Sequence, residues 1–266
     1  MGQGGRGRQQ ARRRRSARQP DSDARAVRRL TLLLSSSGPI AIGPHLNKSI
    51  GYDPRKDFTP IMNVAGVAQA LVVPASSRHR NVQDLIASAK AAPGKLNYGS
   101  GGSGSTQHLT MELFKQRAGI DIQHVPYKGS APAYTDMMGG QIEAIFDSVP
   151  SAVPFVKSGQ MRVLAVSTAQ RDSTLPDVPT VAESGLRGFD VLGWLGIVGP
   201  KGLNPAIRDK INADLKKALA TEAVKEKMAK IGMQPVGGSP EDFGKYIASE
   251  YARWGDVIKA GDIKAE

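Results

Sequence analysis

The sequence predicts an α/β protein built as two lobes. From Leu30 onward, short apolar runs alternate with stretches of helical periodicity, a pattern typical of βαβ units around a largely parallel sheet. The 266 residues are enough for one two-lobed domain or two small domains with a substantial core. Hydrophobic residues make up 40% and charged residues 23% of the chain, ordinary globular proportions that argue against wholesale disorder and against a coiled coil.

Apolar runs bounded by turn residues predict the strands. The predicted strands are 30–34, 61–64, 70–73, 96–98, 122–125, 144–146, 163–166 and 191–198.

Three of the intervening helices have recognisable start signals. Asn81 is a candidate N-cap for a helix with one apolar face that ends before Gly94. Asn204 followed by Pro205 predicts a second start. The four residues from Ser239 resemble a capping box at the start of a third helix. We interpret the apolar stripe of this third helix as core rather than as part of a cofactor site.

Two segments, 74–77 and 193–196, have the composition of crossings between lobes. They predict a discontinuous first lobe, 30–74 with 195–266, and an inserted second lobe, 75–194. A chain that leaves one lobe and returns to it makes a hinged cleft, where small ligands usually bind.

The net charge of +12 is concentrated at the start of the chain. Residues 1–29 hold ten Arg and two Asp, a net +8, which leaves only +4 for the rest. This basic head has almost no apolar residues, so we expect it to be disordered. An Arg-rich head can bind RNA, but this one has no interleaved aromatic residues, and a solvated tail is the preferred interpretation. The apolar run at 30–34 is too short for a secretory signal, and no run approaches the length of a membrane span.

Several chemistries are excluded or unsupported. The chain has no cysteine, which excludes disulfides, thiolate metal sites and cysteine nucleophiles. Its four histidines lack metal-ligand spacing, so no metal is expected, and a packing or hydrogen-bonding role is favoured for His108. Neither a nucleophile elbow nor a Walker A pattern occurs in the glycine-rich segment.

The Gly/Ser run at 98–108, between a predicted strand and a predicted helix, is the richest candidate segment. Its glycines allow close backbone approach. The N–H groups at the helix start, with the hydroxyls of Ser103, Ser105 and Thr106, would suit a carboxylate or phosphate. A flexible turn with hydroxyl caps explains the segment equally well. The run also contains a Gly99–Gly104 dinucleotide fingerprint, a weak match because the next strand does not end in an acidic residue.

Two further loops, 127–132 and 147–150, follow predicted strands and would face the same crevice, because ligand groups gather at the carboxyl ends of strands in open α/β sheets. Asp147 would accept a hydrogen bond from a ligand or cap the next helix, and capping is favoured for this residue alone. Lys128 would add a positive field or be solvated. The run 35–39 offers an opposing wall in the other lobe.

Taken together, these segments resemble the periplasmic solute-binding proteins of tripartite tricarboxylate transporters, the Bug family. Order and spacing agree from about residue 30 to the end. The segments that carry the resemblance are 31–39, 52–61, 93–100, 108–114, 125–129, 139–142 and 175–183.

The resemblance implies a two-lobed Venus-flytrap binder rather than an enzyme, with no cofactor and no nucleic-acid partner. Such a protein captures a small carboxylated metabolite in the cleft between its lobes and presents it to membrane permease subunits, and its location is periplasmic. The ligand-binding residues that the resemblance implies are Ser37 and Gly38 in one lobe, and Ser103, Gly104, Ser105, Thr106, Tyr127, Lys128, Gly129 and Asp147 in the other.

The sequence departs from the family pattern at its start. Members begin with an export signal, a strand, a Pro-Gly-Gly-type loop, a helix and a second strand before the part equivalent to Thr31. Residues 1–29 stand in that place here. We therefore expect that the first βα elements of lobe 1 and the export signal are missing, and that 1–29 are not part of the native fold. The chain would then be a truncated or frame-shifted copy, and its sheet would have an unpaired edge.

Two other function classes stay open. A nucleotide- or dinucleotide-dependent enzyme using the Gly99–Gly104 loop would bind a cofactor and have an acid at the next strand end, which the sequence lacks. A nucleic-acid binder working through residues 1–29 would show steep salt dependence and would lose binding when the head is deleted.

Overall fold

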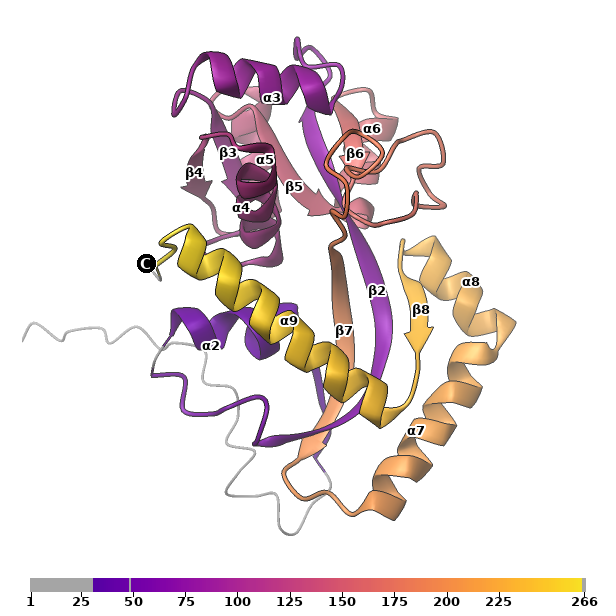
Figure 1. Cartoon of the computed structure of the whole chain (residues 1–266). Coiled ribbons are helices and arrows are strands. Elements are labelled where there is room, and N and C mark those ends of the chain that lie inside the picture. The colour runs from indigo at the N-terminus through magenta and orange to yellow at the C-terminus, as the bar shows by residue number, and fades with distance from the viewer. Residues whose placement is uncertain (1–30, 48, 265–266) are drawn as a thin grey trace, which may run out of the picture.

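The computed structural model describes residues 31–47 and 49–264, which form a mixed α/β fold (Figure 1). The expectations for residues 1–29 lie outside the described residues. The strands are β1 (Leu33–Ser36), β2 (Phe58–Pro74), β3 (Asn97–Ser100), β4 (Gln123–Pro126), β5 (Ala144–Ser148), β6 (Met161–Val166), β7 (Leu192–Pro200) and β8 (Gln234–Gly237). The helices are η1 (Gly38–Ile42), α2 (Gly43–Leu46), α3 (Val82–Ala91), α4 (Thr106–Ala118), α5 (Ser130–Met138), α6 (Val149–Lys157), α7 (Pro205–Ala220), α8 (Glu222–Lys230) and α9 (Pro240–Ala260).

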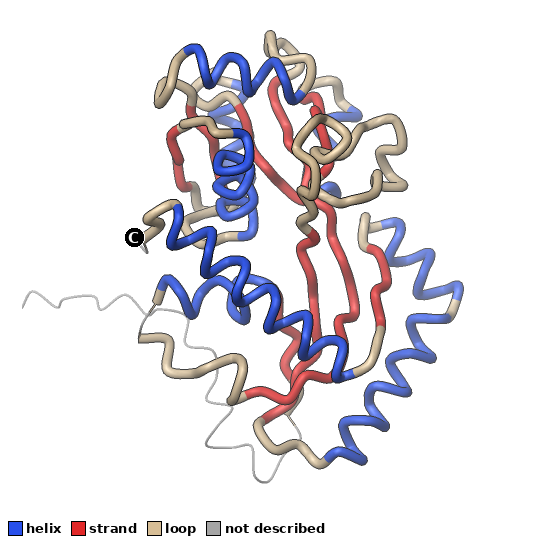
Figure 2. The backbone as a smooth tube through the Cα atoms, viewed as in Figure 1, coloured by secondary structure: helices blue, strands red, loops and turns tan. Residues whose placement is uncertain are grey.

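The sheet is organised around β2, a strand of 17 residues. Residues 58–68 of β2 pair with β7, and part of this stretch also pairs with β8. Residues 69–74 pair instead with β5 and β6. The predicted strands 61–64 and 70–73 are therefore one continuous strand, and it runs beside β7 through the middle of the molecule (Figures 1 and 2).

The prediction of a largely parallel sheet is wrong. Among the described strands, β3 pairs in parallel with β4 and β5. The pairs β1–β7, β2–β5, β2–β6, β2–β7 and β2–β8 are all antiparallel. A strand buried on both faces has a continuous apolar run whichever way its neighbour points, so run length and composition do not reveal strand direction.

The predicted helix starts are confirmed. The side chain of Asn81 accepts from the backbone N–H of Asp84 at 2.9 Å, and that of Asn204 accepts from Ala206 N–H at 2.9 Å. Ser239 begins α9 with a reciprocal capping box. Each cap satisfies a backbone donor that the first turn of a helix leaves without an acceptor.

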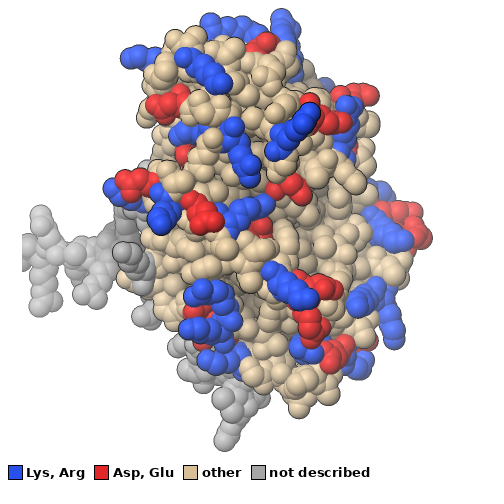
Figure 3. Space-filling view, in the orientation of Figure 1, with Lys and Arg blue, Asp and Glu red and all other residues tan. Residues whose placement is uncertain are grey.

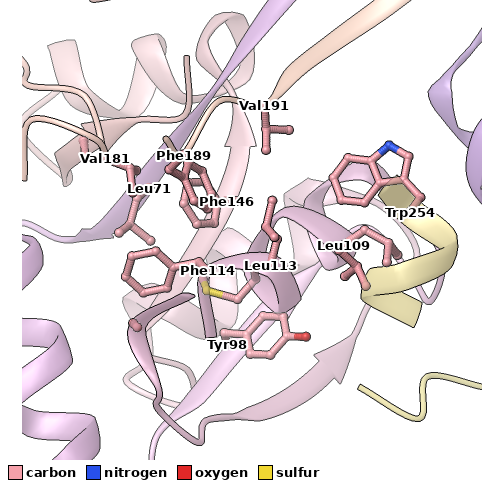
Figure 4. Close-up of a cluster of buried hydrophobic side chains, with 14 of the residues drawn as sticks. Leu71, Tyr98, Leu109, Leu113, Phe114, Phe146, Val181, Phe189, Val191 and Trp254 are labelled. Carbon is pink, nitrogen blue, oxygen red and sulfur yellow. The ribbon is translucent and has the colours of Figure 1, made fainter. Parts of the chain in front are cut away.

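One group of buried apolar side chains reaches across the molecule. It includes Phe114 and Phe146, which meet edge to face at 5.8 Å between ring centroids, and also Trp254 of α9. Figure 4 shows Leu109 of α4 beside Trp254, with Leu113 of the same helix nearer the phenylalanine rings. The Gln116 side chain of α4 also donates to the carbonyl of Val257 in α9, at 2.9 Å. Helix α9 therefore belongs to the same core as α4.

We predict that Gly196→Ala destabilises the fold. A Cβ added at Gly196 of β7 would lie 2.1 Å from Phe243 Cζ, so the ring would have to leave its place in the core. Overpacking of this kind costs about 1–3 kcal/mol. The measurement is the free energy of unfolding from urea denaturation.

Gly244→Ala is the matched control, because a Cβ there meets Pro60 Cγ only at 3.6 Å. Ala exceeds Gly in helix propensity by about 0.8–1 kcal/mol, so this variant should be as stable as the parent or more so. Equal stabilities for the two variants would contradict the packing argument.

Candidate functional site

The loops after β3 and β4 lie together near the carboxyl end of β5, which α6 follows directly. The backbone N–H of Tyr127, just after β4, donates to the carbonyl of Ser100 at 3.0 Å. The N–H of Gly129 donates to the carbonyl of Gly101 at 3.3 Å. Because β3 pairs in parallel with both β4 and β5, the three strands end at the same edge. The loops after β3 and β4 lie together as expected, whereas residues 147–150 form the end of β5 and the start of α6 rather than a loop.

One side chain that the sequence did not reveal, Gln107, joins the Gly-rich turn to the start of α5 and the end of β5. Its Oε1 accepts from the N–H of Gly101, after β3. Its Nε2 donates to Ser130 Oγ at 2.8 Å, after β4, and to Asp147 Oδ1 in β5. A single glutamine carries no sequence pattern, so only the folded structure identifies this role.

Asp147 lies behind the loops rather than at the surface. Its side chain is 1% exposed, and its Oδ1 also accepts from the N–H of Ser148 at 2.7 Å. Burial raises the pKa of Asp147, and hydrogen bonds from neighbouring groups, including Ser148 N–H and Gln107, act in the opposite direction. The helix-capping interpretation of Asp147 is wrong, because α6 is capped by Ser148, whose hydroxyl accepts from Ser151 N–H at 3.4 Å.

The Gly-rich turn is held by its own hydrogen bonds. Gly104 has a φ of +78°, and its N–H donates to His108 Nδ1 at 3.0 Å. The N–H of Gly102 donates to Ser100 Oγ at 3.1 Å, and Ser105 Oγ caps α4 by accepting from His108 N–H at 3.2 Å. Several N–H groups of the turn thus already have acceptors. The first two N–H groups of α4, which follow Ser105, have none within the helix by its geometry.

A stack of aromatic rings contacts this turn. The rings of His108 and His124 are parallel within 6°, with centroids 3.8 Å apart, and Tyr98 stacks on His124 at 4.9 Å. Ser100 Oγ is 2.7 Å from His124 Nε2. Burial, with the nearby His108 and Lys115, lowers the pKa of His124 to about 3, so this ring is neutral at physiological pH. His108 makes the packing and hydrogen-bonding contacts predicted for it.

The remaining predicted residues of the second lobe have distinct environments. The Tyr127 hydroxyl donates to Asp136 Oδ2 at 2.8 Å, and burial with this bond raises the pKa of Tyr127 to about 12. Lys128 is exposed, and Gly129 begins α5 with a φ of +99°. Ser103 is half-buried in the turn.

Thr106 faces the point where β2 and β7 run side by side. A Cβ added at Gly193 of β7 would lie 4.0 Å from Thr106 Cγ2 and 3.2 Å from Gln69 Nε2. Gln69 of β2 is 4% exposed and was not predicted as a site residue.

The predicted residues of the first lobe lie at the start of η1. Ser37 is 1% exposed and is its N-cap residue, and Gly38 has open space where a Cβ would be. Helix α2, which follows η1, comes close to the Gly-rich turn through Leu46. A Cβ on Gly104 would lie 2.7 Å from Leu46 Cδ1.

Within residues 31–47 and 49–264, no three His, Asp or Glu side chains gather closely enough to hold a metal ion. No helix in these ranges combines the length and the apolar character needed to cross a bilayer. Lys and Arg are interspersed with Asp and Glu over the face seen in Figure 3, with no broad patch of one sign.

Comparison with known proteins assigns the family. The model of the tripartite tricarboxylate transporter family receptor matches residues 26–263. Protein BugT of Bordetella pertussis is 37% identical over 233 residues, which cover 88% of this chain and 72% of BugT. The chain belongs to this receptor family, whose members are periplasmic solute-binding proteins.

Solved structures agree with this assignment. A protein from R. palustris determined with adipate has a TM-score of 0.79 and 37% identity, and the match covers 88% of this chain and 78% of that one. The periplasmic binding protein BugD has a TM-score of 0.75 and 29% identity, with 88% and 79% covered. The predicted α/β periplasmic-binding-protein architecture is confirmed.

We predict that His124 makes the fold less stable in acid. Its pKa is about 3 in the folded chain and near 6.5 when unfolded, so below pH 6.5 the unfolded chain takes up a proton that the folded chain does not. Stability is therefore lost as pH falls from about 6.5 toward 3. The loss is at most about 1.4 kcal/mol per pH unit, and solvent screening makes it smaller because the ring is partly exposed.

His124→Gln keeps an amide that can bond Ser100 but does not titrate. Urea denaturation at about pH 7 and about pH 5 should show a smaller acid loss for this variant than for the parent. An unchanged difference between the two pH values would show that His124 does not carry the effect.

Proposed function

We propose that the chain is the solute-binding component of a tripartite tricarboxylate-type transport system and captures a small carboxylated metabolite. The observation that carries this proposal is the Gly-rich turn at 100–105, which precedes α4, is bonded to the loop after β4 and is linked through Gln107 to Asp147 in β5. A relative with the same fold was determined with adipate, a dicarboxylate, which supports this class of ligand.

The proposed site lies between two lobes, 30–74 with 195–266 and 75–194. A carboxylate there is stabilised by the helix dipole of α4, by the N–H groups of its first turn, and by hydroxyl donors. The residues proposed to face the ligand are Ser37, Gly38, Ser103, Gly104, Ser105, Thr106, Tyr127, Lys128 and Gly129.

Such a protein binds and releases its ligand without changing it. We propose that it works in the periplasm and delivers the ligand to the permease subunits of the transporter, as its family implies. Binding that depends on loops of both lobes would couple ligand capture to the closure of a hinge.

A thermal melt against a panel of carboxylates tests the proposal. The panel contains adipate, malate and citrate, with NAD and ATP as nucleotide controls. A ligand that binds only the folded chain raises its midpoint, and we expect this for at least one carboxylate and for neither nucleotide. A midpoint raised only by a nucleotide would favour the dinucleotide interpretation of the Gly99–Gly104 run instead.

We predict that Gly104→Ala weakens carboxylate binding. A Cβ at φ +78° is strained and would press on Leu46 Cδ1, so the turn must move. Loss of one aligned hydrogen bond to a charged ligand corresponds to about tenfold weaker binding or more. Isothermal titration with the best carboxylate of the panel measures the change.

Gly140→Ala is the matched control, because Gly140 has a similar φ of +73° with no atom near its missing Cβ. It lies in the exposed turn after α5. This variant should lose stability without losing affinity. Equal losses of affinity in the two variants would show that the effect comes from general strain rather than from the turn at Gly104.

A further inference from the structure

We propose that Asp147 is a positioning residue that sets the Gly-rich turn through Gln107 and does not itself contact the ligand. This inference rests on the proposed function, because it concerns the same loops. It assigns Asp147 a different part from the ligand contact that the family resemblance implies.

The hydrogen-bond chemistry of the three groups allows one arrangement. A backbone N–H such as that of Gly101 only donates, whereas Asp147 Oδ1, which already accepts from Ser148 N–H, presents an acceptor to Gln107. The amide of Gln107 has one accepting and one donating end, and it lies between them. Oε1 must therefore face Gly101, and Nε2 must face Asp147. An acceptor at residue 147 thus determines which end of the amide meets the turn.

Asp147 is well placed to act as the fixed end of this chain of bonds. It lies in β5, opposite Ala70 of β2, in the interior of the sheet. Its carboxylate is 1% exposed and is held by the N–H of Ser148. Gln107 and Ser148 N–H both bond Oδ1, so a ligand atom would reach that oxygen only by displacing Gln107. The other oxygen, Oδ2, is buried and has no hydrogen-bond partner among the described residues.

At the other end of this series of hydrogen bonds, Gly101 lets the Gln107 amide come close to the backbone. A Cβ added at Gly101 would lie 2.5 Å from Gln107 Oε1, so only glycine lets the amide come this near the backbone. Ser130 Oγ accepts from the same Nε2 at 2.8 Å and orients the amide further. Asp147 therefore orients the Gln107 amide, and this amide fixes the position of Gly101. The N–H of Gly129 donates to the Gly101 carbonyl, so the loop after β4 is positioned by the same contacts.

The first test needs no ligand. The full chain is labelled with ¹⁵N-glycine, and hydrogen exchange at the Gly101 amide is followed by NMR. Gln107→Ala and Asp147→Ala should each speed this exchange by about tenfold or more, because both free the N–H from its acceptor. The double variant should exchange no faster than Gln107→Ala alone.

Asp147→Asn tests whether the turn needs only an accepting oxygen at residue 147 or a negative charge there. Asparagine keeps an oxygen that accepts from Gln107, so Gly101 should exchange within about threefold of the parent rate. Gln123→Ala, on the exposed start of β4, is the control and should change nothing at Gly101. Unchanged Gly101 exchange in Asp147→Ala would overturn the proposal.

If Asp147→Ala fails to melt cooperatively, a second pair of variants tests whether residue 147 positions Gly101 through residue 107. Gln107→Glu places two carboxylates against each other and should free Gly101, and Asp147→Asn added to it supplies a donor and should restore slow exchange. Failure of the added change to slow exchange would contradict the proposal.

Titration with adipate then tests the same chain of bonds in the liganded state. Asp147→Ala should weaken binding by about tenfold, Asp147→Asn by less than about threefold, and the double variant with Gln107→Ala no more than Gln107→Ala alone. If Asp147→Asn is as damaging as Asp147→Ala, or if the losses multiply, Asp147 contacts the ligand directly and the proposal is wrong. If the parent binds none of the carboxylates, the proposed function fails, and the exchange experiment alone decides the role of Asp147.

Discussion

The hydrogen-bonding register of β2 is the constraint on which the rest of the structure depends. This strand of 17 residues pairs with β7 and β8 along its first part and with β5 and β6 along its last part. It places Asp147 opposite Ala70 and Ser148 opposite Gln69. A slip of one residue would turn every side chain of the strand to the other face, so the core and the position of the loops are set together.

Buried polar contacts connect the site loops to the strands whose positions this register sets. Asp147 extends from β5 to Gln107, and Gln107 extends to Gly101. The stacked rings of His108 and His124 also hold the same turn, through Gly104 N–H and Ser100 Oγ. Buried polar groups cost free energy unless they are hydrogen-bonded, and here their bonds also fix a glycine-rich turn that has little rigidity of its own.

Local signals in the sequence account for the parts of the fold that were predicted. Asn81, Asn204 and Ser239 are caps whose chemistry acts within three residues, so their effect does not depend on tertiary structure. The loops at 100–105 and 127–129 were predicted to meet because each follows an apolar run, which holds whichever way the other strands point. The family resemblance supplied the class of protein.

Features that depend on distant partners were not predicted. Gly66 and Gln69 interrupt the apolar run between residues 64 and 70 of β2, so one strand looked like two. Strand β8 and helix α8 are short and mostly exposed, and neither has the apolar periodicity that reveals such elements. Gln107 lies 40 residues from Asp147 in sequence, and neither residue type indicates the other.

The most direct test of the account is a titration of the ¹⁵N-glycine-labelled chain with adipate, followed by NMR. The account predicts that the amides of Gly102, Gly104 and Gly129 shift as ligand is added, while those of Gly140 and Gly202, in turns after α5 and β7, do not. Shifts confined to the remote glycines, with other carboxylates giving the same result, would contradict a carboxylate site at the start of α4.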